Sequence, residues 1–138
     1  MPESDVEIVR RAFEAFSRSD FESALAVMSS EIRIYPQPDE PGVEECYEGW
    51  DELFDYLVNW FSAWEDSTAE LERVLDAGEY VIVDAREVGV AEQSGIRVEE
   101  TFAHAFKLHG GKIIEWRMFR RVETAFAELG IAPPSGLS

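Results

Sequence analysis

The stretch "EETFAHAFKLHGGKIIEW", residues 99–116, predicts two β-strands joined by a tight turn. Apolar and polar residues alternate on both sides of "HGG", and glycines tolerate the positive φ angles that short hairpin turns require. His104 lies between Phe102 and Phe106 in the period-two pattern, so it interrupts an otherwise apolar stripe. This hairpin indicates a sheet-containing fold, and His104 is the residue in it whose role needs an explanation.

The same period-two alternation extends over the whole of residues 69–119. It predicts four strands separated by short turns, over residues 69–76, 80–91, 97–108 and 112–119. Short turns allow only hairpin connections between neighbouring strands, so most of the sheet is expected to be antiparallel.

The N-terminal half shows helical periodicity instead. Ser4 and Glu7 have the spacing of a capping box, and apolar residues follow three and four positions apart. A second helix follows the break at "SRSD", so two helices are expected within residues 4–30. The apolar residues of a third helix, expected over residues 50–64, line one broad face.

Shorter segments connect these elements. "EIRIYP", residues 31–36, predicts one strand, and the prolines that follow it predict a loop up to residue 49. A short helix ends at Gly130, and residues 131–138 form a tail. The order of elements predicts one α+β domain, residues 1–138, in which three N-terminal helices pack on a cone-shaped, curved, mostly antiparallel sheet.

The composition limits the partners of the chain. With 29 acidic and 12 basic residues, its formal net charge is −17, which repels nucleic acid and anionic lipid. Hydrophobic residues make up 46% of the sequence, enough for a folded core. The single cysteine rules out an internal disulfide, and neither a signal peptide nor a long apolar span is recognisable. We therefore expect a cytoplasmic protein that binds neither nucleic acid nor membranes.

Three segments together resemble the nuclear transport factor 2-like superfamily, and within it the SnoaL-like polyketide cyclases and ketosteroid isomerases. They are "AFEAFSRSDFESALAVMSSEIRIYP" (12–36), "YEGWDELFDYL" (47–57) and "GIRVEETFAHAFKLHGGKIIEWRMF" (95–119). The resemblance implies a cystatin-like α+β barrel with a pocket for a small molecule inside the cone. It does not fix the function, because this fold serves isomerases, cyclases, dehydratases, epoxide hydrolases and binding proteins.

The resemblance also implies positions for catalytic groups. Ketosteroid isomerases combine a carboxylate base after the first strand, a Tyr on the first helix and a protonated Asp before the last hairpin. The matching residues here are Tyr35, Ala12 and His104. Since Ala donates no hydrogen bond and a phenol is a poor base at neutral pH, ketosteroid isomerase chemistry is not predicted. The resemblance to SnoaL-like cyclases implies a less strictly defined mechanism, in which an Asp or His in the cone removes an acidic proton. His104 fits that role.

His104 is thus the first candidate for catalysis, because imidazole gains and loses a proton near neutral pH. The alternative is a buried, neutral histidine that is hydrogen-bonded to the backbone or to a nearby Tyr or Glu. Glu100 lies on the same stripe and is expected to pair with His104, or otherwise with Arg86 or Arg117 on a neighbouring strand.

Asp84 and Arg86 are the second candidates. They alternate with Ile82 and Val88, and we expect this row to face into the cone. A charged pair in an apolar hollow is costly unless it is used or mutually satisfied. An Asp–Arg pair inside the cone resembles the active site of limonene epoxide hydrolases, in which a water molecule is bound between acidic and basic groups of this kind. The alternative is a structural ion pair.

Other residues are expected to line the pocket. Tyr35 and Tyr47 offer hydroxyl groups at its mouth, with Tyr35 counted among the catalytic candidates. The remaining predicted pocket residues are bulky side chains that line the cone or fill it: Phe13, Phe16, Met28, Phe54, Trp64, Phe102, Trp116 and Met118. Two histidines, one of them in a turn, predict no metal site, and no phosphate-binding loop or other cofactor motif is present.

Two hypotheses follow. In the first, the chain is an isomerase, cyclase or lyase without a cofactor, acting on a small, largely apolar molecule. In the second, it is a non-catalytic ligand-binding or dimerisation domain. The resemblance implies a homodimer through the outer face of the sheet, for which Val81, Val83, Ala85, Ala103 and Ala105 offer a flat surface.

Overall fold

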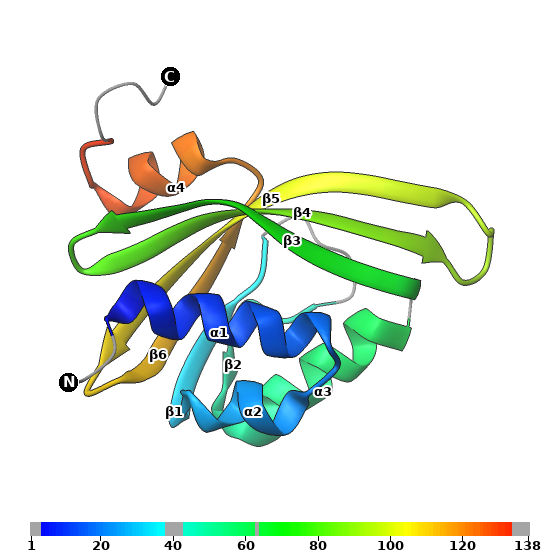
Figure 1. Ribbon diagram of the computed structural model, residues 1–138, viewed down its shortest axis with the longest axis horizontal. Helices are drawn as coiled ribbons and strands as arrows, with labels where there is room; N and C mark the ends of the chain where they lie inside the picture. Colours follow the sequence, from blue (N-terminus) through cyan, green and yellow to red (C-terminus); the bar gives the residue numbers. More distant parts are fainter. Residues whose placement is uncertain (1–3, 38–42, 63, 134–138) are drawn as a thin grey trace.

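A computed structural model describes residues 4–37, 43–62 and 64–133. Its helices and strands follow one another as α1 (Asp5–Ser17), α2 (Phe21–Ala26), β1 (Met28–Tyr35), β2 (Tyr47–Glu48), α3 (Gly49–Ser62), β3 (Trp64–Ala77), β4 (Tyr80–Ala91), β5 (Arg97–His109), β6 (Lys112–Phe119) and α4 (Val122–Leu129). The strands form one six-stranded sheet in the order β2-β1-β6-β5-β4-β3 (Figure 1). All neighbours pair antiparallel except β1 and β6, which are parallel. The α+β class and the mostly antiparallel sheet predicted from the sequence are confirmed.

The first two helices begin where the sequence predicts. The Ser4 hydroxyl oxygen accepts the backbone N–H of Glu7 at 3.2 Å and caps α1. The Asp20 carboxylate accepts the backbone N–H of Ser23 at 3.2 Å and caps α2. These caps satisfy N–H groups that have no partner within the helix.

Two predicted helix ends are wrong. The helical segment predicted to reach residue 30 ends at Ala26, because Met28 already pairs with Ile113 of β6. The third helix ends at Ser62, and Trp64 begins β3 instead of closing the helix. In both places strand pairing prevails over local helical periodicity, and the two-residue strand β2 left no periodic signal at all. The part of the predicted tail beyond residue 133, and residues 38–42 of the predicted loop, lie outside the described residues.

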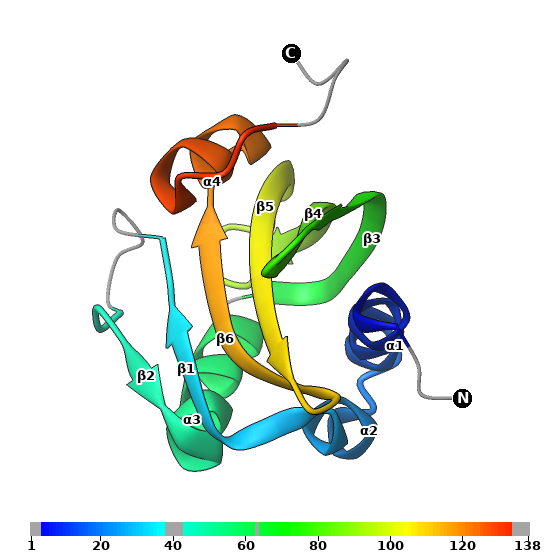
Figure 2. The same ribbon diagram turned by 90° about the vertical axis from the view of Figure 1, so that its left-hand side faces the viewer.

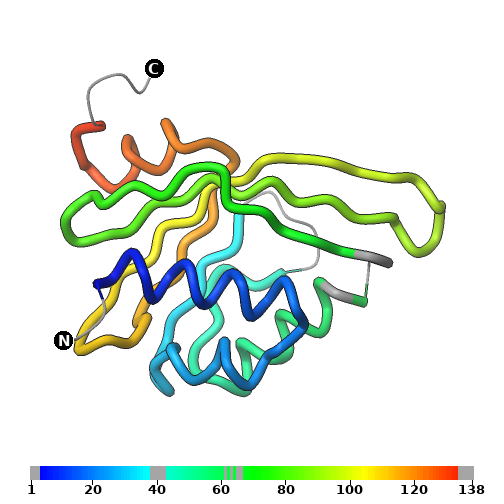
Figure 3. Tube along the Cα trace, in the orientation of Figure 1, coloured from blue at the N-terminus to red at the C-terminus, as the bar shows by residue number. Residues whose placement is uncertain are grey.

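The hairpins of the sheet are close to the predicted ones. β4 and β6 have the predicted limits, and β5 extends to His109. Gly110 and Gly111 both adopt positive φ angles, 58° and 78°, in the turn between β5 and β6. Figure 3 shows β4 and β5 running side by side to a hairpin that projects beyond the helices, and β1 lying next to β6 despite their distance in the sequence.

Two hydrophobic clusters lie on opposite faces of the sheet. The inner cluster packs Val83, Phe106 and Trp116 against α1 and α3. The outer cluster packs Ile82, Ala103 and Ala105 against α4. Figures 1 and 2 show α1, α2 and α3 on the side toward which the sheet curls, and α4 on the opposite side. The fold thus has a concave inner face and an outer face that is partly covered by its own last helix.

The dimer surface predicted from the sequence is wrong. Val81, Val83 and Ala85 belong to the inner cluster and are at most 2% exposed. Ala103 and Ala105 lie on the outer face, but α4 covers them. These five residues therefore do not form one exposed surface, and a homodimer through the outer face remains a prediction without the contacts first assigned to it.

The packing of α4 can be tested with Phe126, which is 2% exposed. We expect Phe126→Ala to lower the free energy of unfolding by about 3–4 kcal/mol, since it leaves a cavity between α4 and the sheet. Urea denaturation followed by circular dichroism measures this. Ile96→Ala is the control, because Ile96 is 62% exposed on the β4–β5 turn, and it should cost less than about 0.5 kcal/mol. Equal stability of the two variants would show that α4 does not pack as described.

Candidate functional site

The concave side of the sheet holds a cavity of about 330 Å³. Helices α1 and α3 and strands β3 to β6 supply its walls. Large aromatic side chains form much of the lining, among them Phe13, Phe16, Trp60, Trp64, Phe102 and Trp116. Its size and its apolar character match sites that bind small organic molecules.

His104 lies in the wall of this cavity and is 6% exposed. Both ring nitrogens have hydrogen-bond partners. The indole N–H of Trp116 donates to Nδ1 at 3.0 Å, and Nε2 lies 3.1 Å from the Glu87 carboxylate oxygen Oε2. Three strands therefore contribute one side chain each to a continuous chain of hydrogen bonds, from β6 through β5 to β4.

The chemistry of the partners fixes the protonation of His104. An indole N–H can only donate, so Nδ1 must be the acceptor and carries no proton. The carboxylate accepts, so Nε2 carries the proton and donates it to Glu87. Together these two hydrogen bonds hold His104 as the neutral tautomer protonated on Nε2.

Aromatic neighbours hold the imidazole ring in place. The Phe13 ring meets it edge-on, with 5.5 Å between ring centroids, and the Phe106 ring is stacked at 6.2 Å. The Trp116 ring is tilted against it at 5.9 Å. Such contacts limit rotation of the imidazole, so the direction of its Nε2–H toward Glu87 is fixed by packing as well as by hydrogen bonding.

Two carboxylates face the cavity next to His104. Glu87 and Glu100 are directly opposite each other in the β4–β5 register, and both line the cavity. The Glu87 side chain is 18% exposed and bonds to His104. Glu100 makes no hydrogen bond or ion pair with any residue in the described part of the chain. Two like charges at directly opposed positions repel each other.

Most residues predicted for the pocket do line it. Besides His104, they are Phe13, Phe16, Trp64, Glu100, Phe102, Trp116 and Met118. Three others do not. Met28 is 1% exposed in the core, Tyr47 is buried with its hydroxyl oxygen accepting the backbone N–H of Glu44, and Phe54 is 50% exposed on the outer side of α3.

Tyr35 lies on the other side of the sheet from the cavity. In the parallel β1–β6 ladder, Ile34 pairs with Trp116 and Tyr35 pairs with Arg117. Since Trp116 faces inward, Tyr35 and Arg117 face outward, and the guanidinium of Arg117 lies 4.0 Å from the centroid of the Tyr35 ring. The expectation that Tyr35 acts beside His104 is therefore wrong.

The expectation that Asp84 and Arg86 face the cone is also wrong. Val83 pairs with His104 and Asp84 with Ala103, so the row of Asp84 lies on the outer face. There Asp84 accepts hydrogen bonds from the guanidinium of Arg73, at 2.7 Å from its Nε. Asp84 therefore pairs with Arg73 and not with Arg86, so the alternative of an ion pair between Asp84 and Arg86 is wrong as well.

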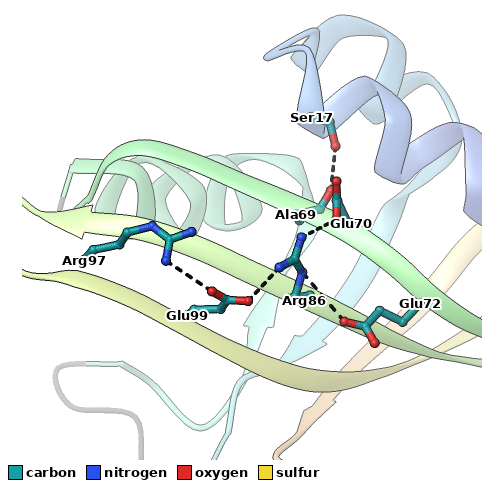
Figure 4. Close-up of polar contacts among 7 residues, drawn as sticks. All are labelled: Ser17, Ala69, Glu70, Glu72, Arg86, Arg97 and Glu99. Carbon is teal, nitrogen blue, oxygen red and sulfur yellow. Dashed lines mark hydrogen bonds and ion pairs between the residues drawn. The ribbon is translucent and has the colours of Figure 1, made fainter.

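Arg86 is held by an outer-face cluster of carboxylates (Figure 4). Its guanidinium donates to Glu99 and Glu70, both at 2.6 Å, and lies 3.8 Å from Glu72. The pKa of Arg86 is raised, mostly by its hydrogen bond to Glu70 and next by its hydrogen bond to Glu99. In turn, the hydrogen bond from Arg86 lowers the pKa of Glu99. Neither Arg86 nor Arg117 reaches Glu100, which faces the opposite side.

A family model described as a SnoaL-like domain matches residues 9–116. The chain belongs to the SnoaL-like family.

Solved structures agree with this assignment. An NTF2-like protein from Burkholderia thailandensis E264 superposes with a TM-score of 0.79 at 23% identity, covering 95% of this chain and 99% of that one. A protein from Jannaschia sp. CCS1, described as a candidate SnoaL-like polyketide cyclase, gives 0.73 at 21% identity, covering 97% and 99%. TerC, co-crystallised with polyporic acid, gives 0.74 at 17% identity, covering 90% and 95%.

At these identities the likeness shows the fold and not the function. The nuclear transport factor 2-like, cystatin-like architecture expected from the resemblance is thereby confirmed. No curated protein sequence matches this SnoaL-like chain.

Glu87 is the site residue that the sequence interpretation missed, and it was within reach. Val81, Val83 and Ala85 form an uninterrupted apolar row that leads directly to Glu87. An acidic residue at the end of such a row is the same kind of signal as His104 between two phenylalanines. Trp60 of α3 and Gln37 also line the cavity of this SnoaL-like protein and were not predicted.

Two further observations concern the described ranges only. Within residues 4–37, 43–62 and 64–133, no His, Cys, Asp and Glu side chains are grouped as three or more potential metal ligands. None of the helices in these ranges has the length and apolar character needed to cross a bilayer.

The tautomer of His104 can be tested by NMR of the ¹⁵N-labelled protein. Long-range ¹H–¹⁵N correlations at neutral pH should show a protonated Nε2 and an unprotonated Nδ1 for His104. His109, exposed in the β5–β6 turn, should show averaged tautomers, and His109→Asn assigns the two signals. Trp116→Phe removes the donor to Nδ1 and should shift the Nδ1 signal of His104, while Nε2 stays protonated toward Glu87. Protonation of His104 on Nδ1, or on both nitrogens, would contradict the hydrogen-bond pattern.

Proposed function

We propose that this SnoaL-like protein binds a small, largely apolar organic molecule in the cone and moves a proton on it. The observation that supports this is the hydrogen-bond chain from Trp116 through His104 to Glu87 in the wall of the cavity. A buried polar chain that ends in a carboxylate at a ligand-sized cavity is a common arrangement for general acid–base catalysis.

In this proposal Glu87, and not His104, receives the proton. Both nitrogens of His104 are engaged, so its ring has no lone pair to offer to a ligand. The Glu87 carboxylate uses one oxygen for His104 and keeps further acceptor capacity toward the cavity. His104 is then a positioning residue that orients Glu87, and Trp116 orients His104.

The reaction best suited to this arrangement is proton abstraction beside a carbonyl group. The C–H bond breaks, its proton forms an O–H bond with Glu87, and its electron pair moves to the carbonyl oxygen. Tyr56 is placed to stabilise that oxygen. Its hydroxyl donates to the sulfur of Met118 at 3.3 Å, and both residues line the cavity. A phenol O–H that donates to an enolate oxygen stabilises its negative charge. Return of the proton to a different carbon gives an isomerase. In a cyclase, the enolate carbon instead forms a bond with a second carbonyl carbon of the same ligand, and Glu87 returns the proton to the oxygen of that carbonyl.

Ligand binding without chemistry is the second candidate. It is favoured by the hydrogen bonds that both ring nitrogens of His104 already make, because they are compatible with a histidine that only packs in the wall of the cavity. The relative TerC, whose crystals contain polyporic acid, supports a small-molecule ligand under either candidate. The epoxide hydrolase alternative depended on Asp84 and Arg86 inside the cone, and it is not carried forward.

The two candidates can be separated with the bicyclic ketone β-tetralone in D₂O. Deuterium incorporation beside its carbonyl, followed by ¹H NMR, reports proton abstraction directly. We expect the protein to accelerate exchange, and Glu87→Gln to lower the rate by about 100-fold or more, since it removes the base. His104→Phe, which keeps a ring but cannot orient Glu87, should lower the rate by about tenfold.

The control is Glu99→Gln, which makes the same change of charge on the same hairpin but on the outer face, and it should leave the rate unchanged. If His104→Phe abolishes exchange while Glu87→Gln keeps it, His104 is the base. If β-tetralone binds but no variant, including the wild type, accelerates exchange, the protein is a binding domain.

A further inference from the structure

We propose that the cone selects a cationic ligand, namely a protonated or quaternary amine carried on an aromatic or apolar frame. This inference rests on the proposed function only in that the cavity binds a small molecule. It depends on three features of the cavity: the opposed carboxylates, the aromatic walls and the lack of a buried positive charge beside them.

The first feature is the pair Glu87 and Glu100. The β4–β5 register places them directly opposite each other on the inner face, where both line the cavity. His104 supplies one N–H to Glu87 but no charge, because its other nitrogen accepts from Trp116. Repulsion between the two carboxylates is therefore not relieved by any ion pair within the described residues. A cation between them would be attracted to both.

The second feature is the aromatic wall around these carboxylates. Trp60 and Trp64, which both line the cavity, are tilted against each other with 5.9 Å between ring centroids. Trp64 lies directly on β4, since a Cβ at residue 89 would be only 3.2 Å from its Cε3. Gly89 is two residues from Glu87, so the indole lies on the strand beside the carboxylate and on the same face. Aromatic rings attract cations through their negative faces, and carboxylates reinforce that attraction.

The third feature is the distribution of positive charge. Among the described residues that line the cavity, Arg120 is the one with a permanently charged cationic side chain, and it is exposed, as Glu100 is, whereas Glu87 is largely buried. The formal net charge of −17 also draws cations toward the protein and repels anions. An anionic ligand would face two carboxylates and the negative faces of several rings, so we reject it in favour of an amine.

Isothermal titration calorimetry with three naphthalene derivatives of matched size tests the proposal. They are naphthalenemethylamine, which is protonated at neutral pH, naphthalenemethanol and naphthoic acid. We expect the amine to bind at least about tenfold more tightly than the alcohol, and the acid to bind most weakly. Glu100→Gln should reduce the preference for the amine severalfold. Trp64→Leu, which keeps an apolar side chain but removes the ring, should weaken the amine more than the alcohol.

Glu99→Gln is the matched control, since it changes the net charge equally on the outer face, and the preference for the amine should persist in it. If the alcohol or the acid binds as tightly as the amine, cation selection is wrong while ligand binding in the cone stands. An amine preference that survives in both Glu87→Gln and Glu100→Gln also overturns it. If none of the three compounds binds, both the cation selection and the proposed small-molecule function fail.

Discussion

The register between β4 and β5 is the constraint on which the site depends. It places Val83 opposite His104 and Glu87 opposite Glu100. The turn that sets it is closed by two backbone hydrogen bonds, from Ala91 N–H to the Ile96 carbonyl at 2.9 Å and from Gly95 N–H to the Ala91 carbonyl at 2.7 Å. A slip of one residue would move the side chains of one strand to the other face. The location of the acidic groups inside the cone is thus decided in a turn whose own residues do not line the cavity.

Element types could be predicted from the sequence because the signals are local. Period-two alternation identified the strands that begin at Tyr80 and Lys112, and Ser4 and the break at "SRSD" (17–20) indicated the starts of two helices. The ends of the helices could not be predicted as well. Met28 and Trp64 continue a helical pattern in the sequence, and they enter strands because distant partners pair with them. Tertiary pairing of this kind leaves no trace in a short window.

The site was predictable in part for a related reason. His104 could be singled out because a polar residue in an apolar stripe needs a partner or a use. Its partners, Trp116 and Glu87, lie on two other strands, and only the register brings them to the ring. The charges alone could not tell which of the two alternating rows of β4 side chains faces the cone, because each row contains both apolar and acidic residues. The error that placed Asp84 inside the cone also hid Glu87.

The parallel pairing of β1 with β6 has a consequence for the order of folding. Ile34 lies beside Trp116 in this ladder, and the Ile113 N–H donates to the Val27 carbonyl at 2.8 Å. These contacts join the first strand of the chain to the last, whereas the hairpins from β3 to β6 close within short stretches. Long-range contacts of this kind form slowly because a long loop must close first. During synthesis, α1, α2 and β1 emerge early but obtain their ladder only after β6 is made. The β1–β6 ladder is therefore the last part of the sheet to form, and until then the side of β1 that pairs with β6 remains an open edge.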